Sequence, residues 1–225
     1  HSTKYLYQTA KKIAWNQLLT SKMTFAISGN VANSKITHSH YAALCLKDAV
    51  VDRMKESTGS RPNVDKRSPD LFLTLHIENN KASIGIDTSG GSLHRRGYRL
   101  EGGEAPISEI VAAAIIRMTK WDGKRPFCDP MCGSGTFLAE AMMHSCRIPA
   151  GYLRKKFGFT GLPDFDAALW KKVKKKADQG ILKSTDIPVS GSDINGSAVN
   201  LAKKNLSRLA GGNKIVIKKS SFADI

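Results

Sequence analysis

A glycine-rich turn is the part of this sequence best suited to holding a ligand. Gly133 and Gly135 can adopt backbone torsions closed to other residues and let the chain pass close to a bound molecule. A helix expected from residue 137 to 146 presents free N–H groups at its start. Asp129 stands at the carboxyl end of an expected strand, where open α/β sheets bind ligands. The turn reads Asp129-Pro130-Met131-Cys132-Gly133-Ser134-Gly135-Thr136.

The turn lacks the patterns that bind phosphate groups. No Gly-Lys-Ser/Thr follows it as in a Walker loop, and no third glycine completes a dinucleotide fingerprint after Gly135. Asp129 would repel a pyrophosphate. S-adenosylmethionine (AdoMet), by contrast, has a cationic methionine portion and no phosphate. A carboxylate here can hold the amino group of that portion, directly or through water, so the turn predicts AdoMet.

Two further acids support this interpretation. Gly191-Ser192-Asp193-Ile194 closes the next expected strand, and a carboxylate there can accept both ribose hydroxyls. A third strand ends near Asp224, where the carboxylate or the neighbouring backbone can bind the adenine amino group. Three acids after three successive strands form one row above a parallel sheet. The separation of Gly135 and Asp193 exceeds what a bare βαβ unit needs, and we attribute the excess to an insertion at 147–188.

Apolar periodicity predicts the elements that must position these acids. Strands and helices alternate, as at the opening of a doubly wound α/β sheet. A helix beginning with Pro106 precedes them, and Gly211-Gly212 is expected to end the last helix. The insertion is predicted to be irregular and basic, with a Lys-rich helical piece. The expected elements are helix 106–120, strand 125–128, helix 137–146, strand 188–192, helix 197–210 and strand 214–218.

The first part of the chain has a different pattern, typical of a small α+β module. Gly29-Asn30 is expected to end its first strand, and the glycine of Thr58-Gly59-Ser60 its second helix. Asn79-Asn80-Lys81 is expected to form a hairpin turn. A glycine-rich hinge follows, at 89–91 and again at 101–103. The expected elements are helices 5–20 and 40–55 and strands 23–28, 70–78 and 82–88.

The distribution of charge indicates a polyanionic partner. Lys and Arg number 35 against 19 acids, which gives a net charge of +16. Each phosphate that a cation neutralises releases counterions, so such a protein favours nucleic acid. Residues 96–146, which include the glycine turn, carry no net charge, whereas residues 1–95 and 147–188 each carry +6 and residues 189–225 carry +4. This pattern suits a ligand pocket flanked by surfaces that grip a large anion.

Several classes of protein are disfavoured. The chain has no run of about eighteen apolar residues that would predict a membrane span. Its start has no signal-peptide core, so a cytoplasmic location is expected. The four cysteines do not form two CxxC pairs, so we predict reduced thiols and no metal. Cys132 would need a nearby base to act as a nucleophile, and the sequence shows none.

The segment Asp129–Thr136 resembles the signature of the bacterial large-subunit rRNA methyltransferase K/L family. Members of that family pair an RNA-binding THUMP domain with a Rossmann-like AdoMet domain. The resemblance covers essentially the whole chain. It extends to residues 47–53, 61–65, 92–99 and 151–159, and to Trp170 beyond them.

The resemblance implies an α/β fold, with an incomplete Rossmann-like (class I) AdoMet methyltransferase sheet preceded by a small α+β THUMP-like RNA-binding domain. It places the THUMP-like domain at 1–95, a linker at 96–105 and the methyltransferase part at 106–225, with the basic insertion 147–188 inside it. The implied reaction is methylation of the exocyclic N2 of a guanine in 23S rRNA. The expected cofactor-binding residues are Asp129, Pro130, Met131, Cys132, Gly133, Ser134, Gly135, Thr136, Asp193, Ile194 and Asp224, with Pro106 and Ser108 at the edge.

The catalytic segment implied by the resemblance is an Asn-Pro-Pro-Tyr type motif a few residues past the third strand. It is expected beyond Ile225, so we expect this chain to be an internal fragment. Such a motif would hold the target amine and stack on its base, so positioning is its main contribution. A base within a helix would first have to be flipped out.

Basic residues near the junction and in the flanking segments are predicted to contact structured RNA. A purely structural role at the junction is the alternative for residues 94–99, as is a solvated helix face for the lysines of 171–176. The oligomeric state is not predicted. The expected RNA contacts are Arg95, Arg96, Arg99, Lys66, Arg67, Arg154, Lys155 and Lys156.

Three other functions remain open from the sequence. A tRNA guanine-N2 methyltransferase and an N6-adenine DNA methyltransferase use related chemistry, although the THUMP-like leader argues against DNA. A non-catalytic module that binds RNA and AdoMet is the third.

Overall fold

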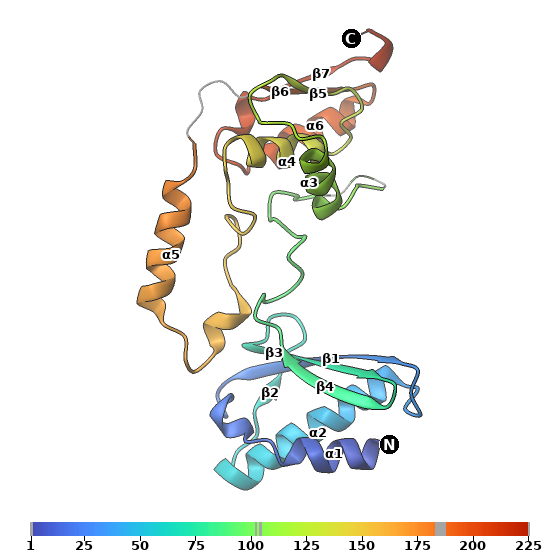
Figure 1. Cartoon of the computed structure of the whole chain (residues 1–225), viewed down its shortest axis with the longest axis vertical. Helices are drawn as coiled ribbons and strands as arrows, with labels where there is room; N and C mark the ends of the chain where they lie inside the picture. The colour runs from blue at the N-terminus through green and yellow to red at the C-terminus, as the bar shows by residue number, and fades with distance from the viewer. Residues whose placement is uncertain (1, 102, 104, 183–187, 225) are drawn as a thin grey trace. The chain divides into compact units, whose positions relative to one another are not determined.

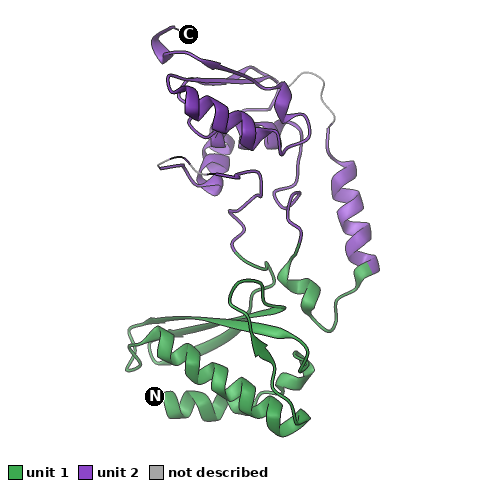
Figure 2. Ribbon diagram, turned by 180° about the vertical axis from the view of Figure 1, so that it is seen from behind, with its two compact units in different colours: residues 1–91, 156–167 green, residues 92–155, 168–225 purple. Residues whose placement is uncertain are grey.

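The computed structural model describes residues 2–101, 103, 105–182 and 188–224, which form two compact units (Figures 1 and 2). Unit 1 comprises residues 1–91 and 156–167, and unit 2 comprises residues 92–155 and 168–225. Gly102 of the expected hinge and residues 183–187 of the expected insertion lie outside the described residues. The domain boundaries drawn from the sequence remain predictions.

Unit 1 is a four-stranded sheet with two helices packed on one face (Figure 1). The strand order is β2-β1-β3-β4, with β1 parallel to β2 and β3, and β3 antiparallel to β4. Alternate residues of β3 are buried, as in a strand with one face on the core. The bounds are α1 Thr3–Lys11, β1 Thr24–Ala32, α2 Ser39–Thr58, β2 Asn63–Val64, β3 Leu71–Glu78 and β4 Lys81–Ile86.

The α+β module expected for this region is confirmed, with differences in the extent of two elements. The first helix ends at Lys11, and a 3-10 turn at Trp15–Gln17 follows. Trp15 is buried and donates its indole N–H to the Ala10 carbonyl at 2.9 Å, so the chain folds back there. The expected end of β1 at Gly29-Asn30 is wrong, because pairing with β3 continues to Ala32. A Cβ on Gly29 would lie 2.6 Å from the Ser39 carbonyl oxygen, so this glycine allows α2 to pack closely.

Two turn predictions in unit 1 are confirmed. Gly59 caps α2 with a φ of 73°, in the left-handed region where glycine is favoured. Asn79 and Asn80 have φ values of 49° and 62° between β3 and β4, as a two-residue hairpin turn requires. Residues 156–167, from the expected insertion, also belong to unit 1, where the Phe159 N–H donates to the Thr88 carbonyl at 2.9 Å.

Unit 2 is a three-stranded parallel sheet of order β5-β6-β7. Helix α4 connects β5 towards β6, α6 connects β6 to β7, and α3 packs against α4. The alternation predicted from the sequence is confirmed, and so is the α/β class. The bounds are α3 Glu109–Met118, β5 Phe127–Asp129, α4 Thr136–Ser145, α5 Ala167–Gln179, β6 Val189–Asp193, α6 Gly196–Leu206 and β7 Val216–Lys219.

Three details of unit 2 depart from or extend the sequence predictions. Helix α3 begins at Glu109 with Ser108 as N-cap, three residues after Pro106. Helix α6 ends at Leu206, before Gly211-Gly212, because these glycines form a return turn. A Cβ on Gly212 would lie 1.9 Å from the Leu206 carbonyl oxygen. The Lys-rich α5 has no buried residue.

No helix among residues 2–101, 103, 105–182 and 188–224 is both long and apolar enough to cross a membrane.

Candidate functional site

The glycine turn joins the end of β5 to the start of α4. Gly133 and Gly135 have φ values of 51° and 82°, torsions that glycine adopts without strain. Gly135 is the N-cap of α4, and its N–H donates to the Cys132 carbonyl at 2.8 Å. A Cβ on Gly135 would lie 3.0 Å from the Cβ of Ala202 on α6. The missing side chain therefore lets α4 and α6 approach each other beside the turn.

Asp193, the last residue of β6, fixes the turn to the neighbouring strand. Its Oδ2 accepts the Gly133 N–H at 2.9 Å, and its Oδ1 accepts the Asn195 N–H at 2.9 Å. The Cys132 N–H donates to the Ser192 carbonyl at 2.9 Å, which adds a second link. Each carboxylate oxygen keeps a further lone pair that can accept a hydrogen bond from a ligand. The sequence predicted a ligand role for Asp193 but not this bond to the turn.

Asp129 and Asp193 form an acidic pair at the carboxyl ends of β5 and β6. Asp129 is half-buried and accepts the Met131 N–H at 3.2 Å. Burial raises the pKa of Asp129 above its usual value, the Met131 N–H opposes that shift, and the charge of Asp193 adds to it. Two carboxylates that repel each other in this way favour a cationic group beside them.

Cys132 lies in the same turn and is buried. Burial and the charges of Asp129 and Asp193 raise the pKa of its thiol to about 12. The thiol is therefore protonated at neutral pH, whereas a nucleophilic cysteine needs a lowered pKa. Among residues 2–101, 103, 105–182 and 188–224, no group of three His, Cys, Asp or Glu side chains could hold a metal ion.

Large apolar side chains stand exposed just beyond the three strands of unit 2. Met131, Ile194 and Phe222 are 69%, 71% and 65% exposed, and they follow β5, β6 and β7 in turn. Exposed apolar groups beside a polar site suit the flat face of a heterocyclic ring. Met131 and Ile194 were expected from the sequence, but Phe222 was missed. Its signal was an aromatic residue in the stretch between the third strand and Asp224.

Three other expected cofactor residues are Pro106, Ser108 and Asp224. Arg99, which was expected to contact RNA, bonds to the residue between the first two. Arg99 bridges the segment before α3 to the start of α4, since its Nη2 donates to the Ile107 carbonyl at 2.9 Å and to Thr136 Oγ1 at 2.8 Å. Pro106 and Ser108 flank that carbonyl. Asp224 is exposed in a 3-10 turn after β7. No hydrogen bond or ion pair joins it to Asp129 or Asp193 in the part of the chain that the structure describes.

Two of the arginines expected to contact RNA point into unit 2 instead of towards solvent. Arg96 lies 3.3 Å from Glu140 Oε1, and its side chain is 12% exposed. Arg99 donates to the Ile107 carbonyl and to Thr136 Oγ1, and its Nε lies 3.7 Å from Glu109 Oε1. These contacts stabilise unit 2. A role in binding RNA remains a prediction for both, since each side chain already donates two hydrogen bonds within unit 2.

The other six expected RNA contacts lie nearer the surface. Arg154 Nη1 donates to the Ser92 carbonyl at 2.9 Å, and Lys156 pairs with Asp70 at 3.3 Å. Arg154 is partly buried, and the exposed members of the set are Lys66, Arg67, Arg95, Lys155 and Lys156.

A parallel sheet with a glycine turn and paired acids at its carboxyl end defines a Rossmann-like cofactor-binding domain. Residues 96–225 match the family described as the RMKL-like methyltransferase domain, and residues 1–87 match the THUMP domain. The chain belongs to the RMKL-like methyltransferase family and carries a THUMP domain.

Curated relatives cover most of this chain. It is 38% identical over 220 residues to slr0064 of Synechocystis sp., a protein named as an RNA methyltransferase. The matched region covers 98% of this chain and 57% of that relative. It is also 38% identical over 207 residues to the ribosomal RNA large subunit methyltransferase K/L of Aliivibrio salmonicida, covering 90% of the chain and 29% of the relative. The chain thus spans little more than half of the first relative and less than a third of the second.

Solved structures give the same fold. SMU.472, described as a methyltransferase and crystallised with S-adenosylhomocysteine (SAH), is 30% identical with a TM-score of 0.86. A Listeria monocytogenes protein named as an N6-adenine-specific DNA methylase is 28% identical, also with a TM-score of 0.86. In both cases the match covers 100% of this chain and 59% of the other.

Proposed function

We propose that this chain binds AdoMet at the carboxyl end of the β5-β6-β7 sheet and RNA through its basic surfaces, as part of an AdoMet-dependent RNA methyltransferase. The observation that carries the proposal is the 2.9 Å hydrogen bond between the Gly133 N–H and Asp193 Oδ2. It makes one site of a glycine turn and an acid that lie 60 residues apart in sequence.

The side chains at this site fit each part of AdoMet. Asp129 would hold the cationic amino group, the free lone pairs of Asp193 the ribose hydroxyls, and Ile194 with Met131 or Phe222 the face of the adenine. Arg99, the arginine beside the start of α4, is already bonded to the Ile107 carbonyl and Thr136 Oγ1 and pairs with Glu109. AdoMet supplies the electrophilic methyl group. The residues of this chain bind and orient it, and the 30% identity to a protein crystallised with SAH supports the same ligand.

The RNA part of the proposal is supported by the THUMP domain, by the net charge of +16 and by the names of the relatives. The finer proposal is methylation of a guanine N2 in 23S rRNA, which agrees with the K/L relatives. The Listeria protein named as a DNA methylase keeps adenine N6 in DNA as the competing target. Labelled AdoMet, given to the complete protein that carries this sequence with deproteinised rRNA, tRNA and DNA, separates these targets. Label in DNA alone would refute the RNA proposal.

Calorimetric titration of AdoMet and SAH into this chain tests the cofactor site. We expect saturable binding that weakens by roughly 1–3 kcal/mol in Asp193→Ala, because a hydrogen-bonded carboxylate is lost. Asp164→Asn, a change of an exposed carboxylate in unit 1, is the control and should bind as the parent does. ATP should not compete, since its phosphates would meet Asp129 and Asp193. Equal binding of ATP, or an unchanged affinity in a folded Asp193→Ala variant, would refute the assignment.

A further inference from the structure

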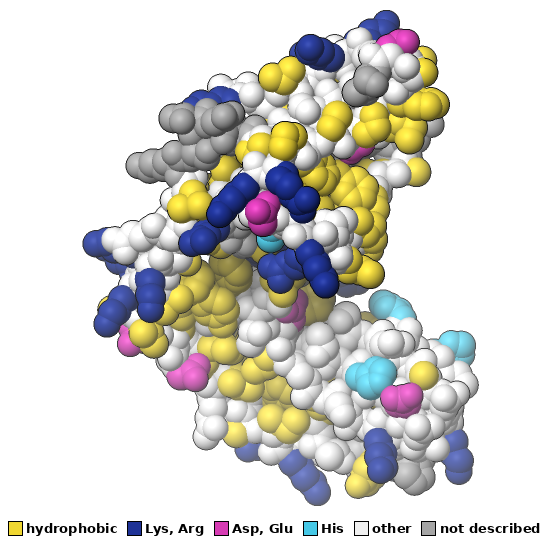
Figure 3. Space-filling model, turned by 45° about the horizontal axis from the view of Figure 1, so that its top comes forward, with side chains coloured by type: hydrophobic (Ala, Val, Ile, Leu, Met, Phe, Trp, Pro, Cys, Tyr) yellow, Lys and Arg dark blue, Asp and Glu magenta, His cyan; other side chains and the backbone are white. Residues whose placement is uncertain are grey.

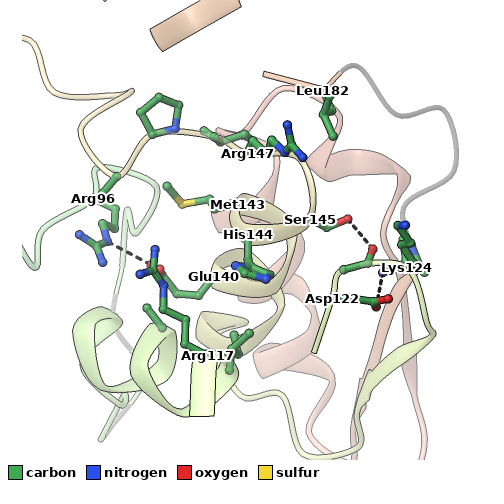
Figure 4. Close-up of a pocket in the computed structure, with 17 residues that line it drawn as sticks. Arg96, Arg117, Asp122, Lys124, Glu140, Met143, His144, Ser145, Arg147 and Leu182 are labelled. Atoms are coloured by element: carbon green, nitrogen blue, oxygen red, sulfur yellow. Dashed lines mark hydrogen bonds and ion pairs between the residues drawn. The ribbon is translucent and has the colours of Figure 1, made fainter. Parts of the chain in front are cut away.

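A second hollow in unit 2 lies between the C-terminal parts of α3 and α4. Its volume is about 830 Å³. Arg117 of α3 lines it, together with the turn at Asp122–Lys124, the loop that begins at Arg147 and, from α4, Glu140, Met143, His144 and Ser145 (Figure 4). We call this hollow the basic cleft.

The basic cleft is separate from the cofactor site. Helix α4 begins at the glycine turn, and its ten residues at 1.5 Å each place its far end in the cleft, about 15 Å from the turn. Lys124 and Pro188, which also line the cleft, precede β5 and β6 and therefore mark the amino end of the sheet. The glycine turn and Asp193 lie at the carboxyl end. A ligand the size of AdoMet in one site does not occupy the other.

The charged groups of the basic cleft fall into two sets. Arg96 and Glu140 form an ion pair at 3.3 Å, and the buried Tyr98 hydroxyl donates to the same carboxylate at 3.0 Å. Within the described ranges, the side chains of Arg117, Lys124 and Arg147 make no ion pair or hydrogen bond. Each of these three cations comes from a different segment around the cleft (Figure 4).

The other titratable groups of the cleft do not cancel this excess. Asp122 accepts the Lys124 backbone N–H at 3.0 Å and is the one lining carboxylate that has no cationic side-chain partner among the described residues. His144 lies 3.1 Å from the Trp121 carbonyl through Nε2, so it forms part of the wall. Figure 3 shows Lys and Arg side chains gathered around an acidic side chain on the face in view.

We propose that the basic cleft binds the sugar-phosphate backbone of the RNA, with Arg117, Lys124 and Arg147 each facing a phosphate. This inference rests on the RNA binding proposed above and adds residues that the sequence did not single out. Cations from three segments around an open hollow suit a chain of phosphates better than one small anion. The far end of α4 lies about 15 Å from the glycine turn, a distance that a few consecutive phosphates of one strand can span. One RNA segment can therefore reach both.

The test is the salt dependence of binding to a labelled stem-loop RNA by the triple variant Arg117→Gln, Lys124→Gln, Arg147→Gln. Each lost phosphate contact makes the slope of log affinity against log salt shallower by about one, so we expect a change of about three. Affinity at moderate salt should fall by about tenfold or more. AdoMet binding, measured by calorimetry on the same sample, should not change, which shows that unit 2 is folded.

A matched control separates a local site from general charge. Lys203→Gln, Arg208→Gln, Lys214→Gln removes the same charge from exposed side chains of unit 2, and we expect a clearly smaller loss. Asp122→Asn keeps an acceptor for the Lys124 N–H and removes the opposing charge, so it should tighten binding a few-fold, a gain that misfolding cannot mimic. Equal losses in the two triple variants, or weaker binding by Asp122→Asn, would overturn the cleft proposal alone. Failure of the unaltered chain to bind RNA would overturn the proposed function as well.

Discussion

The two ends of helix α4 carry opposite charges. Asp129 and Asp193 lie beside its N-terminus, and Arg147 follows its C-terminus. Both arrangements complement the helix dipole, which is positive at the start and negative at the end. A bare helix N-terminus attracts anions. Here the two acids already supply the negative charge, which suits the cationic portion of AdoMet, whereas the cations at the other end have no partner among the described residues.

The largest expected effect is a loss of stability on removing Arg96, which is paired with Glu140, compared with removing Arg117, which has no ion pair among the described residues. Arg96→Met leaves the buried Glu140 carboxylate with Tyr98 alone, and we expect the free energy of unfolding of unit 2 to fall by about 2–3 kcal/mol. Arg117→Met, which breaks no recorded pair, should change it by less than about 0.5 kcal/mol. Chemical denaturation of both variants measures this. Equal losses would mean that the two arginines do not differ in role.

The ion pair between Arg96 and Glu140 can also be tested by the pH dependence of stability. Burial raises the pKa of Glu140, whereas Arg96 and the Tyr98 hydroxyl lower it. Removing Arg96 raises that pKa further. A carboxyl whose folded pKa lies above its unfolded value binds its proton more tightly in the folded state, so its contribution to stability grows as the pH falls through that range. The Arg96→Met defect should therefore shrink on acidification, and a defect independent of pH would contradict the pairing.

The next effect concerns the glycine turn at the other end of α4. Gly135→Ala forces a non-glycine residue to a φ of 82° and places its Cβ 3.0 Å from the Ala202 Cβ. We expect a loss of about 2 kcal/mol in stability, with strain and crowding both contributing. Gly133→Ala is the matched comparison, since its φ is 51° and nothing lies within 4 Å of the added Cβ. It should lose about 1 kcal/mol, and an equal loss would exclude the α6 contact as a cause.

The two ends of α4 also differ in how well the sequence predicts them. The glycine turn is contiguous, and Asp193 ends the next strand of a regular alternation, so both could be placed without a structure. Arg117, Lys124 and Arg147 come from three separate segments, and only the fold brings them to one cleft. The inward bonds of Arg96 and Arg99 were missed because Glu140 and Glu109 read as ordinary helix residues. Element ends such as Leu206 depend on a close return of the chain, which apolar periodicity does not encode.

A smaller effect tests the acidic end through pH. The pKa of Asp129 is raised above the usual 3.8, mainly by burial. Its ionised form holds the cationic group, so AdoMet affinity should begin to fall at a higher pH than for an ordinary aspartate, by about tenfold once Asp129 is protonated. Without AdoMet, the stability of the chain should respond in the opposite way. The raised folded pKa of Asp129 means that its contribution to stability grows as the pH falls. Asp129→Asn should bind more weakly at neutral pH and lose this dependence, and an unchanged profile would remove Asp129 from the site.

The smallest expected effect concerns the apolar side chains beyond the strands. Ile194→Ala should weaken AdoMet binding by about 1 kcal/mol, because less apolar surface covers the adenine, with little change in stability since the side chain is 71% exposed. Val216→Ala shortens another exposed apolar side chain, 55% exposed, within β7 and should leave AdoMet affinity unchanged. RNA binding at the basic cleft should respond to neither variant, since both changes lie at the sheet and not at the C-terminal end of α4. A loss of RNA affinity in Ile194→Ala without AdoMet present would show that the two sites share a surface.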